Sequence, residues 1–322
     1  MKPSNKKHFN KWLLLWLIPL VIILGISFMG ISMWLASNQL LFPSFRGITK
    51  NFSVCNPETV KYFGRDCGNL RESNEFKFSE VKVASVNGYD LPGWFIKSSE
   101  NGFGAAQGAV FLVPAGGSDR REDTKYIKYF LSRHLDVLTY DPGCAGEAPC
   151  PVPGLSYGER ESRDVFSVYL YLTKNYSKVY AMGSSVGASS ILIALPQMPK
   201  LAAVIAENPM ISMQRLIKEA PEAKGAPEGM LDFMINLAMT RGKFDGLVSP
   251  ESSLKLTSAT PIFFVHSKED RIVSYKQTQE LYDLYSGPKS VWIADRGEHA
   301  AIWNTDHVLY EQRLTNFLNN IK

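Results

Sequence analysis

The residues best suited to chemistry are the run Gly183-Ser184-Ser185-Val186-Gly187, which fits the pattern G-x-S-x-G. The run lies between a predicted strand, residues 178–182, and a predicted helix that begins at Val186. A serine in this context sits on a tight, strained turn whose neighbours must be small. We therefore predict that Ser185 is a nucleophile. A phosphate-binding helix start and a simple tight turn are the alternative interpretations.

A serine hydroxyl near neutral pH needs a base, and the base must be oriented by an acid. His299 lies in the loop after the last predicted strand and is the predicted base. Asp270 follows the strand predicted at 262–265 and is the predicted acid. Glu269 and Asp295 are competing acids. The remaining histidines have less suitable positions; they are His8, His134, His266 and His307.

The elements that position these side chains alternate between strands and helices. Such alternation predicts an α/β fold with a mostly parallel, twisted sheet covered by helices on both faces. Asn87-Gly88 marks a hairpin that adds antiparallel strands at one edge. Strands are predicted at 81–86, 91–97, 109–113, 136–140, 178–182, 201–206, 262–265 and 290–293. Helices are predicted near 122–133 and 157–173, from 186, and at 274–285 and 306–319.

Residues 210–256 interrupt the alternation with a long, Met-containing segment. Its apolar residues Met230, Phe233, Met234 and Leu237 have helical spacing. Long segments of this kind usually serve a site, so we expect an inserted cap over a pocket. An ordinary packed connection, with methionines filling gaps, is the alternative.

The chain resembles the α/β-hydrolase superfamily over about residues 80–322. The resemblance rests on G-x-S-x-G after one strand, an H-x-x-x-D loop after a later one, and a histidine loop after the last. The chain order Ser185, Asp270, His299 is that of the superfamily. The N-terminal apolar segment and Ala206-Glu207-Asn208-Pro209 further resemble membrane-anchored, Bem46-like serine hydrolases.

The resemblance implies an oxyanion hole made by the Val186 backbone N–H and a second N–H from the loop after 109–113. That loop reads Pro114-Ala115-Gly116-Gly117-Ser118, where relatives commonly carry His-Gly. The second donor is therefore open among Ala115, Gly116 and Gly117, and we choose Gly116. The run from Asp141 to Glu147 also departs from the superfamily, because it lacks the arginine of D-x-R-G-x-G-x-S.

The implied activity is hydrolysis of an ester-type acyl bond by a membrane-anchored esterase or lipase-like enzyme. It needs no metal and no organic cofactor. The expected substrate is a small-molecule or lipid-like acyl compound. A thioesterase or serine peptidase would use the same three residues. A non-catalytic binding protein on the same fold is an alternative from a different class.

The N-terminal part of the chain predicts a membrane anchor. Trp12 to Ala36 is a run of 25 uncharged residues, long enough for a helix to span a bilayer. The four lysines among the first eleven residues precede this run, so the positive-inside rule places the N-terminus in the cytoplasm and the catalytic domain outside it. A cleaved signal peptide is the alternative.

Charge and cysteine content set further limits. The formal charge of +4 comes entirely from those lysines, so the neutral body gives no reason to expect nucleic-acid binding. We predict disulfides Cys55–Cys67 and Cys144–Cys150, with free thiols as the alternative. The predicted organisation is a basic tail and transmembrane anchor (1–36), an irregular juxtamembrane linker (37–76) and a hydrolase domain (77–322) with the cap at 210–256.

Overall fold

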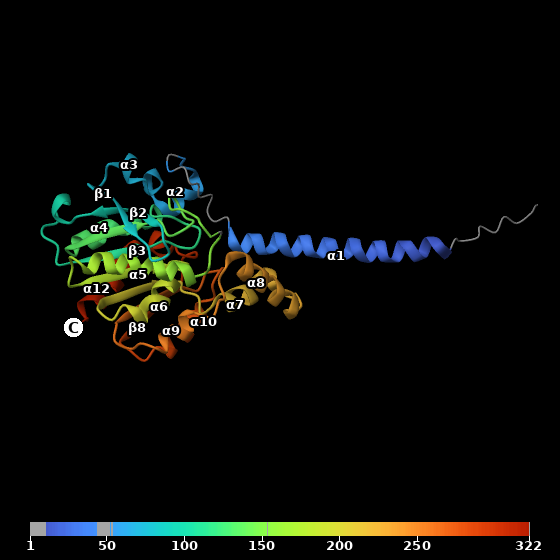
Figure 1. The fold of residues 1–322 in the computed structure, drawn as a ribbon. Helices are drawn as coiled ribbons and strands as arrows, with labels where there is room; N and C mark the ends of the chain where they lie inside the picture. The colour runs from blue at the N-terminus through green and yellow to red at the C-terminus, as the bar shows by residue number, and fades with distance from the viewer. Residues whose placement is uncertain (1–10, 44–51, 53, 153, 322) are drawn as a thin grey trace, which may run out of the picture.

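The computed structural model describes residues 11–43, 52, 54–152 and 154–321. A single long helix, α1 (Lys11–Leu41), extends away from a rounded α/β body (Figure 1). The basic tail, residues 1–10, and much of the first part of the predicted linker lie outside the described residues.

The body is built on an eight-stranded sheet with the order β1-β2-β4-β3-β5-β6-β7-β8. The first two strands form the predicted hairpin, and β2 also pairs antiparallel with β4, whereas all other pairs are parallel. This mixed, mostly parallel sheet confirms the predicted architecture. The strands are β1 (Ser79–Ala84), β2 (Asp90–Ile96), β3 (Gly108–Val113), β4 (Leu135–Tyr140), β5 (Val179–Ser184), β6 (Leu201–Glu207), β7 (Ile262–Ser267) and β8 (Lys289–Ala294).

Helices cover both faces of the sheet, and the side chains of each strand alternate between them. In β3, Phe111 packs with α5 and α6, whereas Val110 and Leu112 pack on the opposite face with α4 and α12. The helices of the body are α4 (Ile127–Ser132), α5 (Glu159–Thr173), α6 (Val186–Ala194), α10 (Tyr275–Leu284), α11 (Ile302–Thr305) and α12 (His307–Asn319).

The parallel register brings the carboxyl ends of the central strands to one edge. Val113 pairs with Gly183, Ser184 with Glu207, and Glu207 with Val265. The segments that follow β3, β5, β6, β7 and β8 therefore start at this edge. All of the residues predicted to be catalytic or oxyanion-binding lie in these segments.

Three helices lie between β6 and β7, in the segment predicted as a cap: α7 (Met213–Glu219), α8 (Glu228–Gly242) and α9 (Pro250–Leu254). Helix α8 contains the predicted apolar spacing, but its buried face is a different one. Ile235 and Ala238 are buried, whereas Met230 and Phe233 are exposed. In Figure 1, α7 and α8 lie at the base of α1, and this contact determines which face of α8 is covered.

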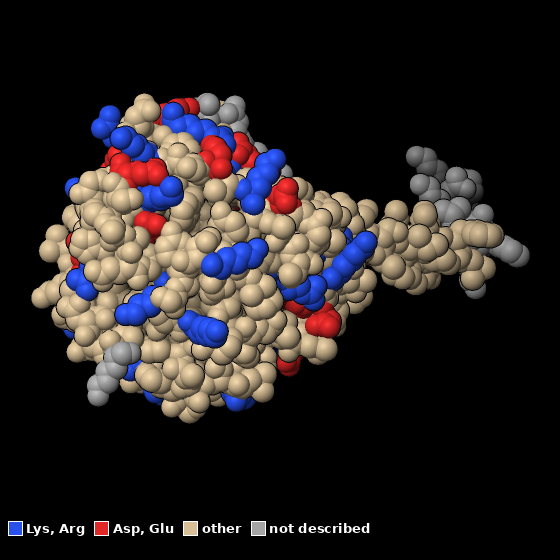
Figure 2. Space-filling model, turned by 60° about the vertical axis from the view of Figure 1, so that its left-hand side comes forward, with Lys and Arg blue, Asp and Glu red and all other residues tan. Residues whose placement is uncertain are grey.

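Helix α1 has the dimensions of a membrane span. Its 31 residues give a length of about 46 Å. The stretch Leu15–Leu41 is long and apolar enough to cross a bilayer, by length and composition. Its apolar side chains are exposed over most of that length. In Figure 2 the visible part of the projecting helix is tan, whereas Lys, Arg, Asp and Glu appear on the body.

The last two turns of α1 are fastened to the body. The guanidinium of Arg241 in α8 donates to the Trp34 carbonyl at 2.9 Å and to the Asn38 side chain at 3.0 Å. The Leu155 N–H donates to the Leu41 carbonyl at 2.8 Å, and Leu41 itself is 2% exposed. The end of α1 is thus part of a packed core with the α7–α8 insertion.

The segment predicted to be an irregular linker contains short helices instead. They are α2 (Pro57–Phe63), a 3₁₀ turn (Arg65–Gly68) and α3 (Leu70–Ser73). Asn56 caps α2 by accepting a hydrogen bond from the Thr59 N–H at 2.9 Å, and Pro57 occupies the first helical position. The disulfide Cys55–Cys67 joins the start of α2 to the 3₁₀ turn, as predicted.

Candidate active site

The backbone at Ser185 has the geometry that the motif predicts. Ser185 lies between β5 and α6 with φ 54° and ψ −117°, a conformation that non-glycine residues rarely adopt. A Cβ atom at Gly187 would lie 2.2 Å from the Val113 carbonyl oxygen, and one at Gly183 would lie 2.7 Å from the Gly187 backbone. The turn therefore requires glycine on both sides, and the Ser185 N–H is held by the Glu207 carbonyl at 2.8 Å.

His299 and Asp270 meet above the same edge of the sheet. The His299 Nδ1 lies 2.6 Å from the Asp270 Oδ2, although 29 residues separate them in the chain. With Nδ1–H donated to the carboxylate, the neutral ring carries its lone pair on Nε2. His299 is 9% exposed and Asp270 is enclosed, so water competes little for this bond.

Asp270 is held by a larger set of donors than the sequence predicts. Its Oδ1 accepts from the backbone N–H groups of Ile272 and Val273, at 2.8 and 3.0 Å. Its Oδ2 accepts from the Asn208 side-chain amide at 2.7 Å and lies 3.0 Å from the His266 Nε2. Both carboxylate oxygens are therefore fixed before any proton is transferred.

These contacts determine the charge of the acid. Burial by itself raises the pKa of Asp270, but the neighbouring His299 and the hydrogen bonds from His266 and His299 outweigh it. The pKa of Asp270 consequently lies well below its ordinary value, and the group is a carboxylate over the whole physiological range. His266, a competing histidine in the sequence analysis, contacts the Asp270 carboxylate and does not take the position of the proposed base.

This lowered pKa predicts an acid-sensitive stability. A carboxyl group whose pKa is lower in the folded than in the unfolded chain stabilises the fold above the unfolded pKa, and that stability is lost as the pH falls through the folded pKa. The urea midpoint of the wild type, followed by tryptophan fluorescence in detergent, is therefore expected to fall progressively below about pH 4. Asp270→Asn is expected to be less stable at pH 7 and to lose less between pH 5 and 3, so the two curves converge. Asp90→Asn, at an exposed strand position, should follow the wild type; curves for Asp270→Asn that stay parallel to the wild type would contradict the assignment.

Asn208 and Tyr62 belong to the site although the sequence analysis did not select them. Asn208 follows β6 with φ 51°, a conformation that asparagine tolerates, and it donates to Asp270. Its position between a buried strand and Pro209 was the available signal. Tyr62 in α2 donates to the Glu298 carboxylate, which also accepts from Lys61 at 2.9 Å. Helix α2 thereby fastens the loop that carries His299.

The loop after β3 narrows the choice of the second oxyanion donor. The Ala115 N–H donates to the Glu122 carboxylate at 3.2 Å, so it is already used. Gly116 borders the same cavity as Ser185, and Gly117 does not. Val186 is the first residue of α6, and its N–H has no acceptor within the helix. Gly116 and Val186 are therefore the best placed pair of donors.

A cavity of about 830 Å³ collects these groups. Ser185, Asp270 and His299 line it together with Gly116 and Val186. Other side chains around it come from α2, from the loop after β6 and from the α7–α8 insertion, namely Tyr62, Met210 and Leu216. The cavity is thus open to a ligand and partly bounded by the predicted cap.

The loop after β4 lacks the arginine expected from relatives, and its Asp141 is bonded instead to Arg120, from the segment after β3. The Asp141 carboxylate accepts from the backbone N–H groups of Arg120 and Glu147, at 2.9 and 2.7 Å. The Arg120 guanidinium lies 3.3 Å from the same carboxylate. Burial raises the pKa of Asp141 to about 7, and the Arg120 charge opposes that rise.

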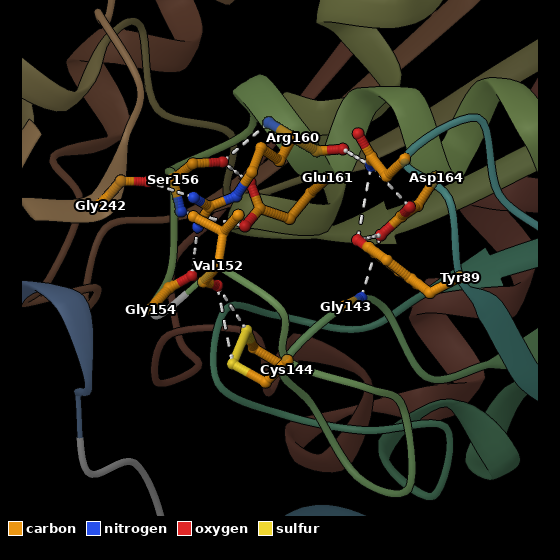
Figure 3. The surroundings of a disulfide bond; sticks show 12 residues. Tyr89, Gly143, Cys144, Val152, Gly154, Ser156, Arg160, Glu161, Asp164 and Gly242 are labelled. Atoms are coloured by element: carbon orange, nitrogen blue, oxygen red, sulfur yellow. Dashed lines mark hydrogen bonds between the residues drawn. A yellow bond between two sulfur atoms is a disulfide. The ribbon is translucent and has the colours of Figure 1, made fainter.

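The predicted disulfide Cys144–Cys150 closes this loop. Figure 3 shows the loop bonded to α5, where the Gly143 N–H donates to the Asp164 carboxylate at 2.9 Å. Arg160 donates to the carbonyl oxygens of Gly154 and Gly242, and so joins this region to the end of α8. All four cysteines are paired, which excludes the free-thiol alternative in this structure.

The chain is similar to known proteins both in sequence and in structure. No protein-family model matches the chain. It is 26% identical over 250 residues to the uncharacterized protein YqkD of Bacillus subtilis, covering 74% of this chain and 78% of the relative. It is 28% identical over 163 residues to a kynurenine formamidase of Eremothecium gossypii, covering 43% of this chain and 64% of the relative.

The solved structure of the Pyrococcus furiosus esterase Pf2001 is similar to this one with a TM-score of 0.61. The match covers 76% of this chain and 93% of the esterase, at 17% sequence identity. The chain therefore has the α/β-hydrolase fold, as the sequence predicts. At this level of identity the likeness concerns the fold, and the argument for activity must come from the site.

Proposed function

We propose that the protein is a membrane-anchored serine hydrolase that cleaves an ester-type acyl bond through an acyl-enzyme. The observation that carries the proposal is the convergence of Ser185, His299 and Asp270 on one cavity, with the serine on strained backbone and the histidine bonded to a fixed carboxylate. The similar structure Pf2001 is named an esterase and the sequence relative from Eremothecium gossypii a kynurenine formamidase, and both names support a hydrolytic activity.

The proposed mechanism uses the geometry of the site directly. Ser185 attacks the substrate carbonyl while the His299 Nε2 takes its proton. The Asp270 carboxylate stabilises the imidazolium that forms, and the N–H groups of Val186 and Gly116 stabilise the tetrahedral oxyanion. His299 then protonates the leaving group, and water repeats the cycle to release the acid. Neither step requires a metal or an organic cofactor.

Membrane anchoring by α1 is part of the proposal. The Arg241 contacts to Trp34 and Asn38 lie on both sides of Ala36, where a signal-peptide cleavage would fall. Cleavage there would break bonds of the folded protein, which supports an uncleaved anchor. With the four lysines that precede the apolar run in the cytoplasm, residues 77–322 would form an extracytoplasmic hydrolase domain and 210–256 its cap.

A fluorophosphonate probe tests the proposal, because it reacts only with an activated serine. We expect the full-length protein in detergent to be labelled and Ser185→Ala to be unlabelled, while Ser162→Ala, which is equally buried at 6% exposure, is labelled like the wild type. Labelling should be followed by peptide mapping to Ser185. Absence of Ser185-dependent labelling would favour a non-catalytic binding protein. A panel of ester, thioester and amide substrates then separates the esterase from the thioesterase and peptidase alternatives.

A further inference from the structure

A second cavity of about 160 Å³ lies beside the catalytic one, and we call it the α1 chamber. Leu41, Phe42 and Pro43, at the end of α1, form one wall. Ala145, from the disulfide-closed loop, and Leu155 contribute to other walls. The membrane-facing helix is thus a structural part of a pocket in the catalytic body.

Among the described residues, the lining of the α1 chamber offers no free charge to a ligand. Glu161 is its acidic side chain, and its carboxylate already accepts from the N–H groups of Ser156 and Gly158, at 3.0 and 2.9 Å. The Ser190 hydroxyl donates to the Val186 carbonyl at 2.6 Å. A ligand that enters the chamber therefore gains chiefly from burying apolar surface.

The chamber and the catalytic cavity share a boundary. Gly116, Leu155 and Val186 line both, together with Ala115 and Ser118. A Cβ atom at Gly116 would lie 2.6 Å from a Val186 methyl carbon and 2.8 Å from a Leu155 methyl carbon, so the backbone of the proposed oxyanion donor forms part of this boundary. The buried Ser118 hydroxyl, at the same boundary, has no hydrogen-bond partner among the described residues.

From this arrangement we infer that the α1 chamber binds the apolar chain of the acyl group, and that the ester comes from the bilayer in which α1 lies. The inference rests on the proposed function. A carbonyl held at Ser185 by the oxyanion donors would lie at this boundary, and its acyl chain would then extend across the boundary into the chamber.

Size and position support this occupant. A cavity of about 150 Å³ holds a molecule of six carbons, so the chamber fits roughly six carbons of a straight chain. Leu41 is the last residue of the stretch Leu15–Leu41, which is long and apolar enough to cross a bilayer. The chamber is consequently close to the lipid surface, where long-chain esters dissolve and from which they have a short path.

The test uses the full-length protein in phosphatidylcholine vesicles with p-nitrophenyl esters of two to twelve carbons. We expect kcat/KM to rise about fourfold per methylene, the factor that corresponds to 0.8 kcal/mol per buried CH₂, and to level off at about eight carbons. Ala145 lines the chamber and not the catalytic cavity. Ala145→Leu fills the chamber with three carbons, and should lower kcat/KM for the octanoate about 50-fold while leaving the acetate within about twofold.

Ala148→Leu is the matched control, because Ala148 is buried in the same loop and does not line the chamber. It should keep the wild-type chain-length profile. An Ala145→Leu profile that matches Ala148→Leu would overturn the inference. If Ala145→Leu also loses the acetate activity, Phe42→Ala replaces it: Phe42 is 48% exposed, and its truncation should weaken octanoate turnover selectively, whereas an unchanged profile would overturn the inference.

Two further arms separate the possible failures. Binding of a dansyl-labelled undecanoic acid to Ser185→Ala, and its loss in the double variant with Ala145→Leu, tests the chamber without catalysis; binding that persists in the double variant contradicts it. Absence of Ser185-dependent labelling by the fluorophosphonate probe would instead contradict the proposed function. A dodecanoate ester dissolved in the same vesicles as the protein should be cleaved much faster than one in separate vesicles, and equal rates would contradict the bilayer as the source.

Discussion

Replacing Ser185 with alanine is expected to lower kcat for p-nitrophenyl acetate by about 10⁶-fold, to the level that binding and the oxyanion donors alone provide. The physical reason is that the variant has no atom to form the acyl-enzyme, while the strained turn and the cavity remain. His299→Ala should cost a similar factor. Because the two residues act as one unit, the double variant should lose little more than either single variant.

The control for this series is Ser162→Ala, which removes an equally buried hydroxyl that does not line the cavity and should leave kcat within about twofold. The unfolding midpoint of Ser185→Ala should be at least that of the wild type, because deleting the side-chain oxygen removes no contact that stabilises the fold. Residual activity in Ser185→Ala above one hundredth of the wild type would mean that another group is the nucleophile. Additive losses in the double variant would mean that His299 does not act on Ser185.

Asp270→Asn is expected to lower kcat by about 10⁴-fold with a small change in KM. An asparagine amide in this position donates where the carboxylate accepts, so it favours the wrong His299 tautomer and cannot stabilise the imidazolium. The donors already directed at Asp270, from Asn208, Ile272 and Val273, also disfavour a neutral amide there. The loss should therefore appear in the chemical step, measured by single-turnover kinetics.

The competing acids supply the controls for Asp270. Asp295 is exposed and paired with Lys268, so Asp295→Asn should leave kcat within about twofold. Glu269 accepts from the Gly297 N–H at 2.9 Å and is not bonded to the histidine, so Glu269→Gln should cost far less than Asp270→Asn. A loss from Glu269→Gln as large as that from Asp270→Asn would transfer the role of the acid to Glu269.

The parts of the fold that the sequence predicts well are those with local signals. Central strands such as β3 and β7 are short, buried, mostly apolar runs, and Asn87-Gly88 specifies the hairpin by itself. The signal for the turn at Ser185 is equally local. It consists of Gly183 and Gly187, where the close backbone contacts leave no room for a larger residue. Placing Asp270 and His299 close together needed only the rule that parallel strands end at the same edge.

The remaining features depend on contacts between segments far apart in the chain. The position of Asn208 between a buried strand and Pro209 draws attention to it, but no local pattern indicates that its amide reaches a carboxylate 62 residues away. The sequence predicts an irregular segment where helix α2 lies. The seven residues of α2 gain stability from a cap, a disulfide and an ion pair to Glu298, and a pattern within so short a helix does not reveal these contacts. The buried face of α8 follows from its partner α1, which a hydrophobic pattern within α8 does not reveal.

The fastening of α1 has a practical consequence for anyone who wishes to prepare the α/β body without its long apolar helix. Deleting the whole apolar segment through Leu41 would open a hole beneath Phe244 and Met213, and would leave the Arg241 guanidinium facing solvent with nothing to hold. A water-soluble version should instead retain the final turns from Trp34 onward, with the outward-facing leucines upstream removed. Such a trimmed protein would keep the walls of both cavities and, on the proposed function, would lose only its attachment to the bilayer.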